Sequence, residues 1–477
     1  MLFNSLDYLI FLPLIFTIYW AIPNRFRWIL LFIASYYFYM SWNVKYVVLI
    51  LFTTIVSYVA ARTLERTDNK RIKKVILTAT LISCLGVLFF FKYFNFLSES
   101  VTDLLSAIAI PVHPVTLNLL LPVGISFYTF QTLSYVIDVY RGSVPAEKHF
   151  GIYATFISFF PQLVAGPIER TGNLLPQINK EHHFNYAKAM DGVKLMLWGY
   201  YKKLVVADVI SPYVDLVYGD PTSYQGFDIL LAMLFFTIQI YCDFSAYSDI
   251  AIGTAKLLDI DLMTNFRTPY FSTSIKEFWS RWHISLSTWF KDYVYIPLGG
   301  NRCSRARHAM NLLITFLVSG LWHGASWTFV VWGLIHGAAQ VIEGLCSKLL
   351  APFQKGKWTR WLSMLLVFLF CNITWVFFRA TSFSDAFYLL QHVLDGITAP
   401  KHYFHNMLNI STMKLLVIFG FIFILAVYDF FDRNSTLIQN LSKKPRIVSW
   451  IFYLCLGLII IFCSQKGAAA EFVYFQF

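Results

Sequence analysis

Two histidines in the stretch Phe271–Gly324 are the residues of this sequence best suited to chemistry. One of them, His323, lies in the run SGLWHGAS between two apolar segments, with Gly320 and Gly324 nearby. Histidine is the usual general base near neutral pH, and glycine allows close backbone approach. In a dry pocket His323 could therefore take a proton from an attacking hydroxyl. A structural histidine bonded to neighbouring carbonyls is the alternative, and residue type alone leaves both open.

The second histidine, His283, lies in the polar and aromatic run FSTSIKEFWSRWHISLSTWFKDYVYIPLGGNR, next to Arg281. There it could orient a thioester carbonyl or line an entry path, while a structural histidine at the membrane interface is the alternative. Large apolar residues in this run recur at helical steps, which predicts one helix that lies along the interface or folds into a cavity. These residues are Trp279, Trp282, Leu286 and Trp289.

Other polar residues are weaker candidates. His336, in WGLIHGAA, is expected to pack or to support the site. Asp243 and Asp249 lie within a predicted span, where carboxylates face the protein interior or a wet cavity. They could form a proton path, or they could pair with a basic residue such as Arg267 or Lys276. No histidine pair has the spacing of a metal site, so neither a metal nor a permanently bound cofactor is expected.

The composition is that of a membrane protein. The 477 residues are 57% hydrophobic and 13% charged, whereas soluble domains carry about 25% charged residues. The net charge of +12 fits basic cytoplasmic loops, and nucleic acid is not expected as a partner. The seven cysteines form no CxxC pair and read as buried apolar residues. The first apolar run lacks the features of a signal peptide and is expected to remain as a span.

Apolar runs of sufficient length predict an all-α polytopic protein with about 11–12 transmembrane helices, forming a single membrane domain over residues 1–477. A shorter apolar run at 151–164 is expected to be re-entrant or interfacial. The candidate spans are 6–22, 26–42, 44–62, 74–97, 117–139, 196–218, 227–252, 309–322, 325–346, 361–378, 411–431 and 448–465.

The distribution of Lys and Arg predicts the orientation of these spans. The basic loop 62–74 should be cytoplasmic, and the loop 98–116, which has neither Lys nor Arg, should be outside. With twelve spans both termini are then outside, including the aromatic segment 467–477 that ends in EFVYFQF. Such a segment should occupy a groove or meet a partner, although simple aromatic anchoring at the interface is the alternative.

Several of these stretches together resemble the membrane-bound O-acyltransferase family. The resemblance rests on NFRTPYFSTSIKEFWSRWHISLSTWFKDYVYIPLGGNR followed by SGLWHGASWTFVVWG, on FFPQLVAGPIER at 159–170 and on IQIYCDFSAYSDIAIG at 238–253. It covers nearly the whole chain and is strongest to the bacterial branch that acetylates alginate or peptidoglycan. It implies a ring of helices around a thin central region with two funnels. It also implies that His323 and His283 are catalytic, within a core stretch at 271–324.

The resemblance further implies transfer of an acetyl group from cytoplasmic acetyl-CoA to a polysaccharide outside a bacterial plasma membrane. An extracytoplasmic partner of the SGNH-hydrolase type would complete the transfer, and the tyrosine hydroxyl of the tail, matched by Tyr474, would serve as an acyl relay. Alternatives are D-alanyl transfer to teichoic acid, a transporter or export channel, and a structural anchor in the lipid membrane for a polymer-modifying complex. We expect five residues to line or support the acyl path, namely Trp282, Trp322, Asp243, Arg281 and Asp292.

Overall fold

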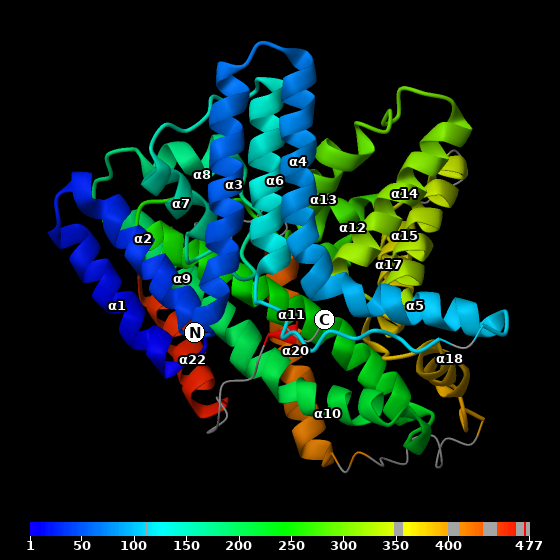
Figure 1. Ribbon diagram of the computed structural model, residues 1–477. Helices are drawn as coiled ribbons and strands as arrows, with labels where there is room; N and C mark the ends of the chain where they lie inside the picture. Colours follow the sequence, from blue (N-terminus) through cyan, green and yellow to red (C-terminus); the bar gives the residue numbers. More distant parts are fainter. Residues whose placement is uncertain are drawn as a thin grey trace. The chain divides into compact units, whose positions relative to one another are not determined.

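The structure is a computed structural model that describes residues 1–110, 112–347, 356–398, 408, 410–432, 446–463 and 472–473. Every regular element within these residues is a helix (Figure 1). The expectation of an all-α fold is therefore confirmed. Tyr474 lies outside the described residues.

The chain divides into two compact units. The boundaries fall within α9 (Tyr186–Tyr200) and α11 (Phe227–Leu257), so both helices contribute to both units. The candidate histidines and Asp243 belong to the second unit, which therefore holds every described residue of the candidate site. The first unit comprises Met1–Val193 and Ile250–Met263, and the second comprises Lys194–Asp249 and Thr264–Phe477.

The first unit is built from helices with polar caps. The hydroxyl of Ser5 accepts the Tyr8 N–H at the start of α1, and the Asn69 side chain accepts two N–H groups at the start of α4. These caps satisfy backbone donors that a helix start leaves open. The elements are α1 (Leu6–Ala21), α2 (Asn24–Met40), η1 (Val44–Tyr46), α3 (Val47–Arg66), α4 (Lys70–Leu88), η2 (Phe89–Tyr93), α5 (Phe94–Ala107), α6 (Ile125–Arg141), α7 (Phe150–Ser158) and α8 (Thr171–Ile178).

The span expected at 117–139 begins later than its apolar run suggests. The helix α6 starts at Ile125, after Gly124, whose φ is 74°. A Cβ at Gly124 would lie 2.7 Å from the carbonyl oxygen of Leu163. The chain therefore turns sharply at a position that only glycine fits, and the helix begins after this turn.

The second unit surrounds the candidate site. Its short helices α12 and α13 precede the long helices α14 and α15, which pack side by side (Figure 1). Its elements besides α11 are η3 (Tyr201–Ala207), α10 (Asp208–Gly219), η4 (Pro221–Ser223), η5 (Pro269–Phe271), α12 (Ile275–Arg281), α13 (Ile284–Phe290), η6 (Lys291–Tyr295), α14 (Arg305–His323), α15 (Trp327–Leu345), α17 (Lys357–Arg379), α18 (Phe383–His392), α20 (Thr412–Phe431) and α22 (Arg446–Cys463).

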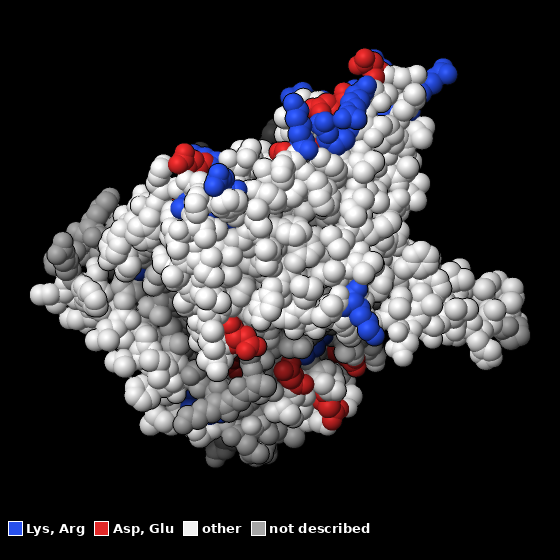
Figure 2. All heavy atoms as spheres, turned by 60° about the vertical axis from the view of Figure 1, so that its left-hand side comes forward, with Lys and Arg blue, Asp and Glu red and all other residues white. Residues whose placement is uncertain are grey.

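Each of the twelve expected spans overlaps a described helix. Six of the described helices are both long and apolar enough to cross a membrane, and α1 and α22 are shorter apolar helices. These helices differ in burial. In the most apolar stretch of α11, 83% of the residues are buried, whereas in the corresponding stretch of Lys70–Ala107 only 17% are buried. The face in Figure 2 carries its Lys, Arg, Asp and Glu in separate patches, with a broad uncharged area between them. The protein is thus a multi-pass membrane protein.

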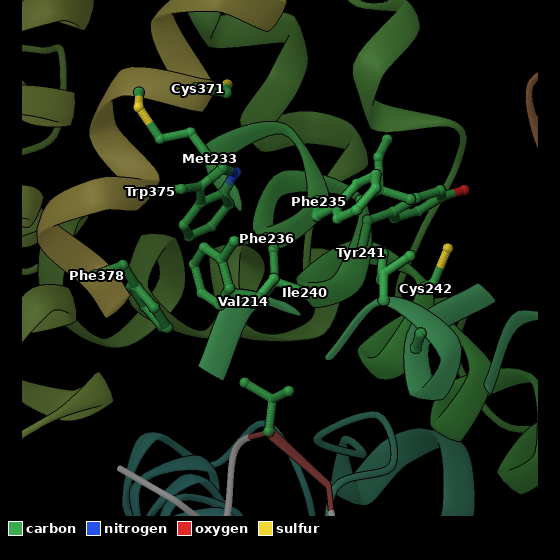
Figure 3. Close-up of a cluster of buried hydrophobic side chains, with 14 of the residues drawn as sticks. Val214, Met233, Phe235, Phe236, Ile240, Tyr241, Cys242, Cys371, Trp375 and Phe378 are labelled. Carbon is green, nitrogen blue, oxygen red and sulfur yellow. The ribbon is translucent and has the colours of Figure 1, made fainter. Parts of the chain in front are cut away.

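The core of the second unit forms around α11. Its residues Phe235, Phe236 and Ile240 are fully buried. Figure 3 shows the rings of Trp375 and Phe378, from α17, next to the ring of Phe236 from α11. This packing fixes α17 against α11 and provides one wall of the candidate site.

Candidate functional site

The run that carries His283 does not form the single helix that its apolar spacing predicts. The helix α12 ends at Arg281, Trp282 is extended, and α13 begins at Ile284. His283 itself has φ 42° and ψ 54°, a left-handed conformation that is uncommon for residues other than glycine. The prediction of one continuous helix was therefore wrong. Backbone strain of this kind gathers at functional sites.

The break is held by Asn265, a residue from the loop that follows α11. The backbone carbonyl of Asn265 accepts the Ile284 N–H at 2.9 Å. Its side-chain Oδ1 accepts the Ser285 N–H at 3.2 Å and the Ser285 hydroxyl at 2.7 Å. These bonds, made just after the break, offset part of the strain and fix the direction in which His283 points.

The same carboxamide determines the tautomer of His283. Nδ1 of His283 lies 3.2 Å from Oδ1 of Asn265. Because the Ser285 backbone N–H can only donate, the Asn265 atom facing it must be the oxygen, and Nδ1 must therefore carry the proton. The neutral ring then has its lone pair on Nε2. Asn265 is fully buried, as is His283, so this orientation is well defined.

Burial lowers the pKa of His283 to about 3. The residue lies outside the candidate membrane spans, yet its side chain is fully enclosed, which penalises the charged imidazolium. One wall is the Phe244 ring, edge-on at 4.6 Å between ring centroids. His283 is therefore a neutral imidazole at physiological pH and serves best as a hydrogen-bond acceptor through Nε2.

His323 ends α14, as expected for a residue at the turn between two apolar runs. Its exposed fraction is 3%. Its ring centroid lies 5.0 Å from that of Trp322, 5.1 Å from Trp332 and 5.3 Å from Phe378. The His283 ring lies 6.5 Å away. The two candidate histidines, 40 residues apart in sequence, thus lie in one cluster of aromatic rings, which we call the aromatic chamber.

Two glycines bring α14 and α15 close enough to build this chamber. A Cβ at Gly320 would lie 2.3 Å from the carbonyl oxygen of Phe329, and one at Gly333 would lie 2.3 Å from that of Phe316. Small residues permit such backbone contact between membrane helices. The contact places Trp332 of α15 directly against His323.

His336 supports the aromatic wall, as its sequence context predicts. The indole N–H of Trp279 donates to Nδ1 of His336 at 3.2 Å, and Nε2 lies 3.1 Å from the hydroxyl of Thr374. Its ring also contacts Trp332 at 5.0 Å. Both ring nitrogens are engaged in structural bonds, so His336 packs and positions.

A cavity of about 1110 Å³ is lined in part by chain neighbours of the two histidines. Basic side chains line part of it, namely those of Lys276, Lys291 and Arg302. Elsewhere it is lined by Ile284, which directly follows His283, and by Ser319, one helical turn before His323. Its lining therefore includes both positive charge and the immediate neighbours of both histidines.

The expected supporting residues fall into three groups. Trp282 and Trp322 belong to the aromatic wall: Trp282 packs on Trp375 at 5.0 Å, and Trp322 lies 6.0 Å from His283. Arg281 instead pairs with Glu277 at 2.9 Å. It also donates to the Arg267 carbonyl, so it stabilises the end of α12.

The third group comprises the carboxylates. Asp292, in η6, is partly exposed. Unlike its chain neighbour Lys291, it is not among the described residues that line the cavity. Asp243 pairs with a lysine, as one of the two expectations for it states, but its partner is Lys203 at 2.7 Å. Asp249 likewise pairs with Lys202 at 2.6 Å. The suggested partners Arg267 and Lys276 were wrong.

Sequence reasoning missed Asn265 and the two lysines. Asn265 stands inside the quoted run NFRTPYF, but an asparagine in a loop gives no chemical signal by itself. Lys202 and Lys203 lie in η3, a π-helical turn that overlaps an expected span. Adjacent lysines within an apolar run, which are expensive in a membrane, were a signal that could have identified them.

Comparison with known proteins identifies the family to which this fold belongs. Residues 146–383 match the membrane-bound O-acyltransferase family. The chain is 40% identical to a probable alginate O-acetylase of Azotobacter vinelandii, over 81% of this chain and 76% of the relative. It is 32% identical to a peptidoglycan O-acetyltransferase of Helicobacter pylori, over 94% and 91%. A teichoic acid D-alanyltransferase of Streptococcus thermophilus is 28% identical over 57% and 72%.

Proposed function

Because this chain belongs to the membrane-bound O-acyltransferase family, we propose that it transfers an acetyl group from acetyl-CoA to a hydroxyl, for O-acetylation of a polysaccharide outside the cell. One observation carries the proposal. His323 and His283 lie in one cluster of aromatic rings, and their neighbours Ser319 and Ile284 line a basic cavity. The site thus combines a base, an oriented neutral imidazole and an approach for an anionic donor.

The basic cavity is the proposed donor site. Coenzyme A carries several negative phosphate charges, which the positive side chains of Lys276, Lys291 and Arg302 would attract. Its thioester end would then point toward Ser319 and Ile284. In the proposed orientation this cavity opens to the cytoplasm of a bacterial cell and both termini lie outside. Lysine and arginine at the cytoplasmic ends of spans support that orientation.

The proposed chemistry is acyl transfer with balanced proton movement. Nε2 or Nδ1 of His323 accepts the proton of the attacking hydroxyl as its oxygen bonds to the thioester carbonyl carbon. The C–S bond then breaks, and the proton passes to the leaving sulfur to give the free thiol. His283 keeps its Nδ1 proton on Asn265, so its neutral ring borders the attacking group without competing for that proton. Alignment supplies much of the rate enhancement.

The proposed first acceptor is the hydroxyl of Tyr474, which would pass the acetyl group to an SGNH-type partner. Phe472 and Val473 support this proposal because both are buried within the second unit, and Phe472 lies 5.6 Å from Phe244. Phe244 in turn contacts His283. The names of the relatives, which acetylate alginate or peptidoglycan, support a polysaccharide as the final acceptor.

Substitution of His323 tests the proposal. We expect His323→Ala to lower the acetylation rate by about 10²–10⁴-fold, the usual contribution of a general base. Radiolabelled acetyl-CoA would report transfer by protein in lipid nanodiscs, and size-exclusion profiles would confirm folding. Undiminished transfer by folded His323→Ala would remove the central claim. Transfer from a D-alanyl-charged carrier in place of acetyl-CoA would identify the alternative activity.

Tyr474→Phe tests the relay separately. It removes only the hydroxyl oxygen and should abolish acetylation of the polysaccharide. Release of free coenzyme A by hydrolysis should continue, because His323 and the donor cavity remain intact. Normal acetylation of the polysaccharide by this variant would exclude the relay while leaving the enzyme assignment in place.

A further inference from the structure

A buried ion cluster formed by residues of η3, α10 and α11 has no part in the chemistry described above. Nζ of Lys203 lies 2.7 Å from Oδ1 of Asp243 and 2.9 Å from Oδ1 of Asp208. The exposed fractions of the three side chains are 9%, 1% and 11%. Two carboxylates therefore share one ammonium group. If all three are ionised, the cluster carries one excess negative charge, which calls for a further hydrogen-bond donor.

That donor comes from the end of the chain. Oδ2 of Asp243 accepts the backbone N–H of Val473 at 2.6 Å, across 230 residues of sequence. A hydrogen bond from a buried amide to a carboxylate is among the strong interactions available to a protein. Lys203 thus holds one oxygen of Asp243, and the C-terminal segment binds the other.

Aromatic packing reinforces this attachment. The Phe472 ring lies 5.6 Å from Phe244 and 5.1 Å from Tyr247, both on α11. Phe472 and Val473 have exposed fractions of 2% and 4%. The segment is therefore fixed to α11 through one backbone bond and one aromatic side chain.

The neighbouring pair on η3 and α11 provides a useful contrast. Lys202 lies 2.6 Å from Asp249 and donates to the hydroxyl of Ser245 at 2.8 Å. Here one lysine faces one carboxylate and a hydroxyl. Lys203 instead holds two carboxylates, and of these it is Asp243 that accepts the backbone bond from the tail.

We propose that Asp243, held by Lys203, is the anchor of the C-terminal segment and sets the position of the residue that follows Val473. Phe472 contacts Phe244, and Phe244 contacts His283 at 4.6 Å. The anchor therefore holds the tail one side chain from the candidate site. The effect of this anchor on acetyl transfer rests on the proposed function, whereas the anchoring of the tail is independent of it. Asp243 is a positioning residue.

Two substitutions separate anchoring from general destabilisation. Asp243→Ala removes the tail acceptor and leaves Lys203 paired with Asp208. Asp208→Ala is the matched control, because it leaves Lys203 paired with Asp243 and the tail bond intact. Hydrogen–deuterium exchange of the full-length protein in nanodiscs would report protection of the amides near Val473.

We expect exchange at the C-terminal peptide to accelerate about 10-fold or more in Asp243→Ala, because a buried hydrogen bond to a charged group is lost. Exchange in Asp208→Ala should remain close to wild type. Equal exchange in Asp243→Ala and wild type would overturn the anchor, as would equal acceleration in both variants. These outcomes need no enzymatic activity, so they hold even if the proposed function fails.

Substitutions in the tail then test the positioning role. Val473→Pro removes the N–H that Asp243 accepts, whereas Val473→Ala keeps it. We expect Val473→Pro to lower acetylation of the polysaccharide at least 10-fold while thioester hydrolysis continues, and Val473→Ala to stay within about 2-fold of wild type. Full acetylation by Val473→Pro would overturn the positioning role.

Discussion

The carboxamide of Asn265 should control His283, and Asn265→Ala tests this directly. The substitution keeps the backbone carbonyl that accepts the Ile284 N–H, so the turn itself retains one bond. It removes the oxygen that receives His283 Nδ1, the Ser285 N–H and the Ser285 hydroxyl. The ring of His283 then loses both its fixed tautomer and its fixed direction.

The expected losses of stability and of kcat follow from these three bonds. Each buried donor left without an acceptor costs about 1–3 kcal/mol, so the thermal stability should fall measurably. Loss of the fixed orientation of the His283 ring should also lower kcat by about 100-fold, which is near the lower end of what positioned acid–base groups contribute. KM for acetyl-CoA should change little, because Asn265 does not appear among the residues lining the donor cavity in the described chain.

Two control variants make the test specific. Ser285→Ala removes one donor to Asn265 but keeps the His283 bond, so kcat should stay within about 3-fold of wild type. Asn265→Asp keeps acceptor oxygens but places a carboxylate beside His283, which raises the pKa of the ring. When the pH is lowered, this variant should therefore lose its activity at a higher pH than the wild-type protein does. A wild-type kcat in folded Asn265→Ala would refute the role of Asn265.

Three further predictions concern packing, charge and pH. Gly320→Ala places a methyl group 2.3 Å from a backbone oxygen and should lower both stability and transfer, whereas Gly420→Ala, with nothing within 4 Å, should be neutral in the same thermal and transfer assays. Lys291→Gln combined with Arg302→Gln should raise KM for acetyl-CoA about 5- to 20-fold with kcat nearly unchanged, an effect that added salt should reduce. Because burial lowers the pKa of His283 to about 3, its titration should not contribute between pH 5 and 8. The pH dependence of transfer in that range should therefore have the same shape in His283→Asn as in wild type, and a changed shape would contradict this assignment.

Much of the fold follows from local sequence, because helix formation in a membrane depends on apolar length. Each expected span overlaps a helix, and the turn at His323 lies where two apolar runs meet. The break at His283 could not be predicted in the same way. Helical spacing favours a continuous helix there, and what opposes it is Asn265, 18 residues earlier. A bond formed only after folding outweighs the local preference.

The ion pairs show the same limit at longer range. Sequence favours a basic partner for Asp243 over a proton path, since an isolated carboxylate is costly inside a membrane protein. Choosing among lysines needs the geometry of η3, whose π-helical turn directs two consecutive lysines to different carboxylates of α11. Pairing was therefore predictable, but the identity of the partner was not.

The environments of the two histidines divide the work of the reaction between them. Transfer from sulfur to oxygen moves one proton from the attacking hydroxyl to the leaving thiolate, so the base must hold that proton briefly. A ring whose pKa is about 3 holds a proton too weakly for this task at neutral pH. His283 therefore leaves the hydroxyl proton to the other histidine, and its neutral ring, whose tautomer Asn265 fixes, helps to position the reacting groups. The proton transfer itself then falls to His323, which ends α14 one helical turn after Ser319 of the donor cavity and packs against the Trp332 ring.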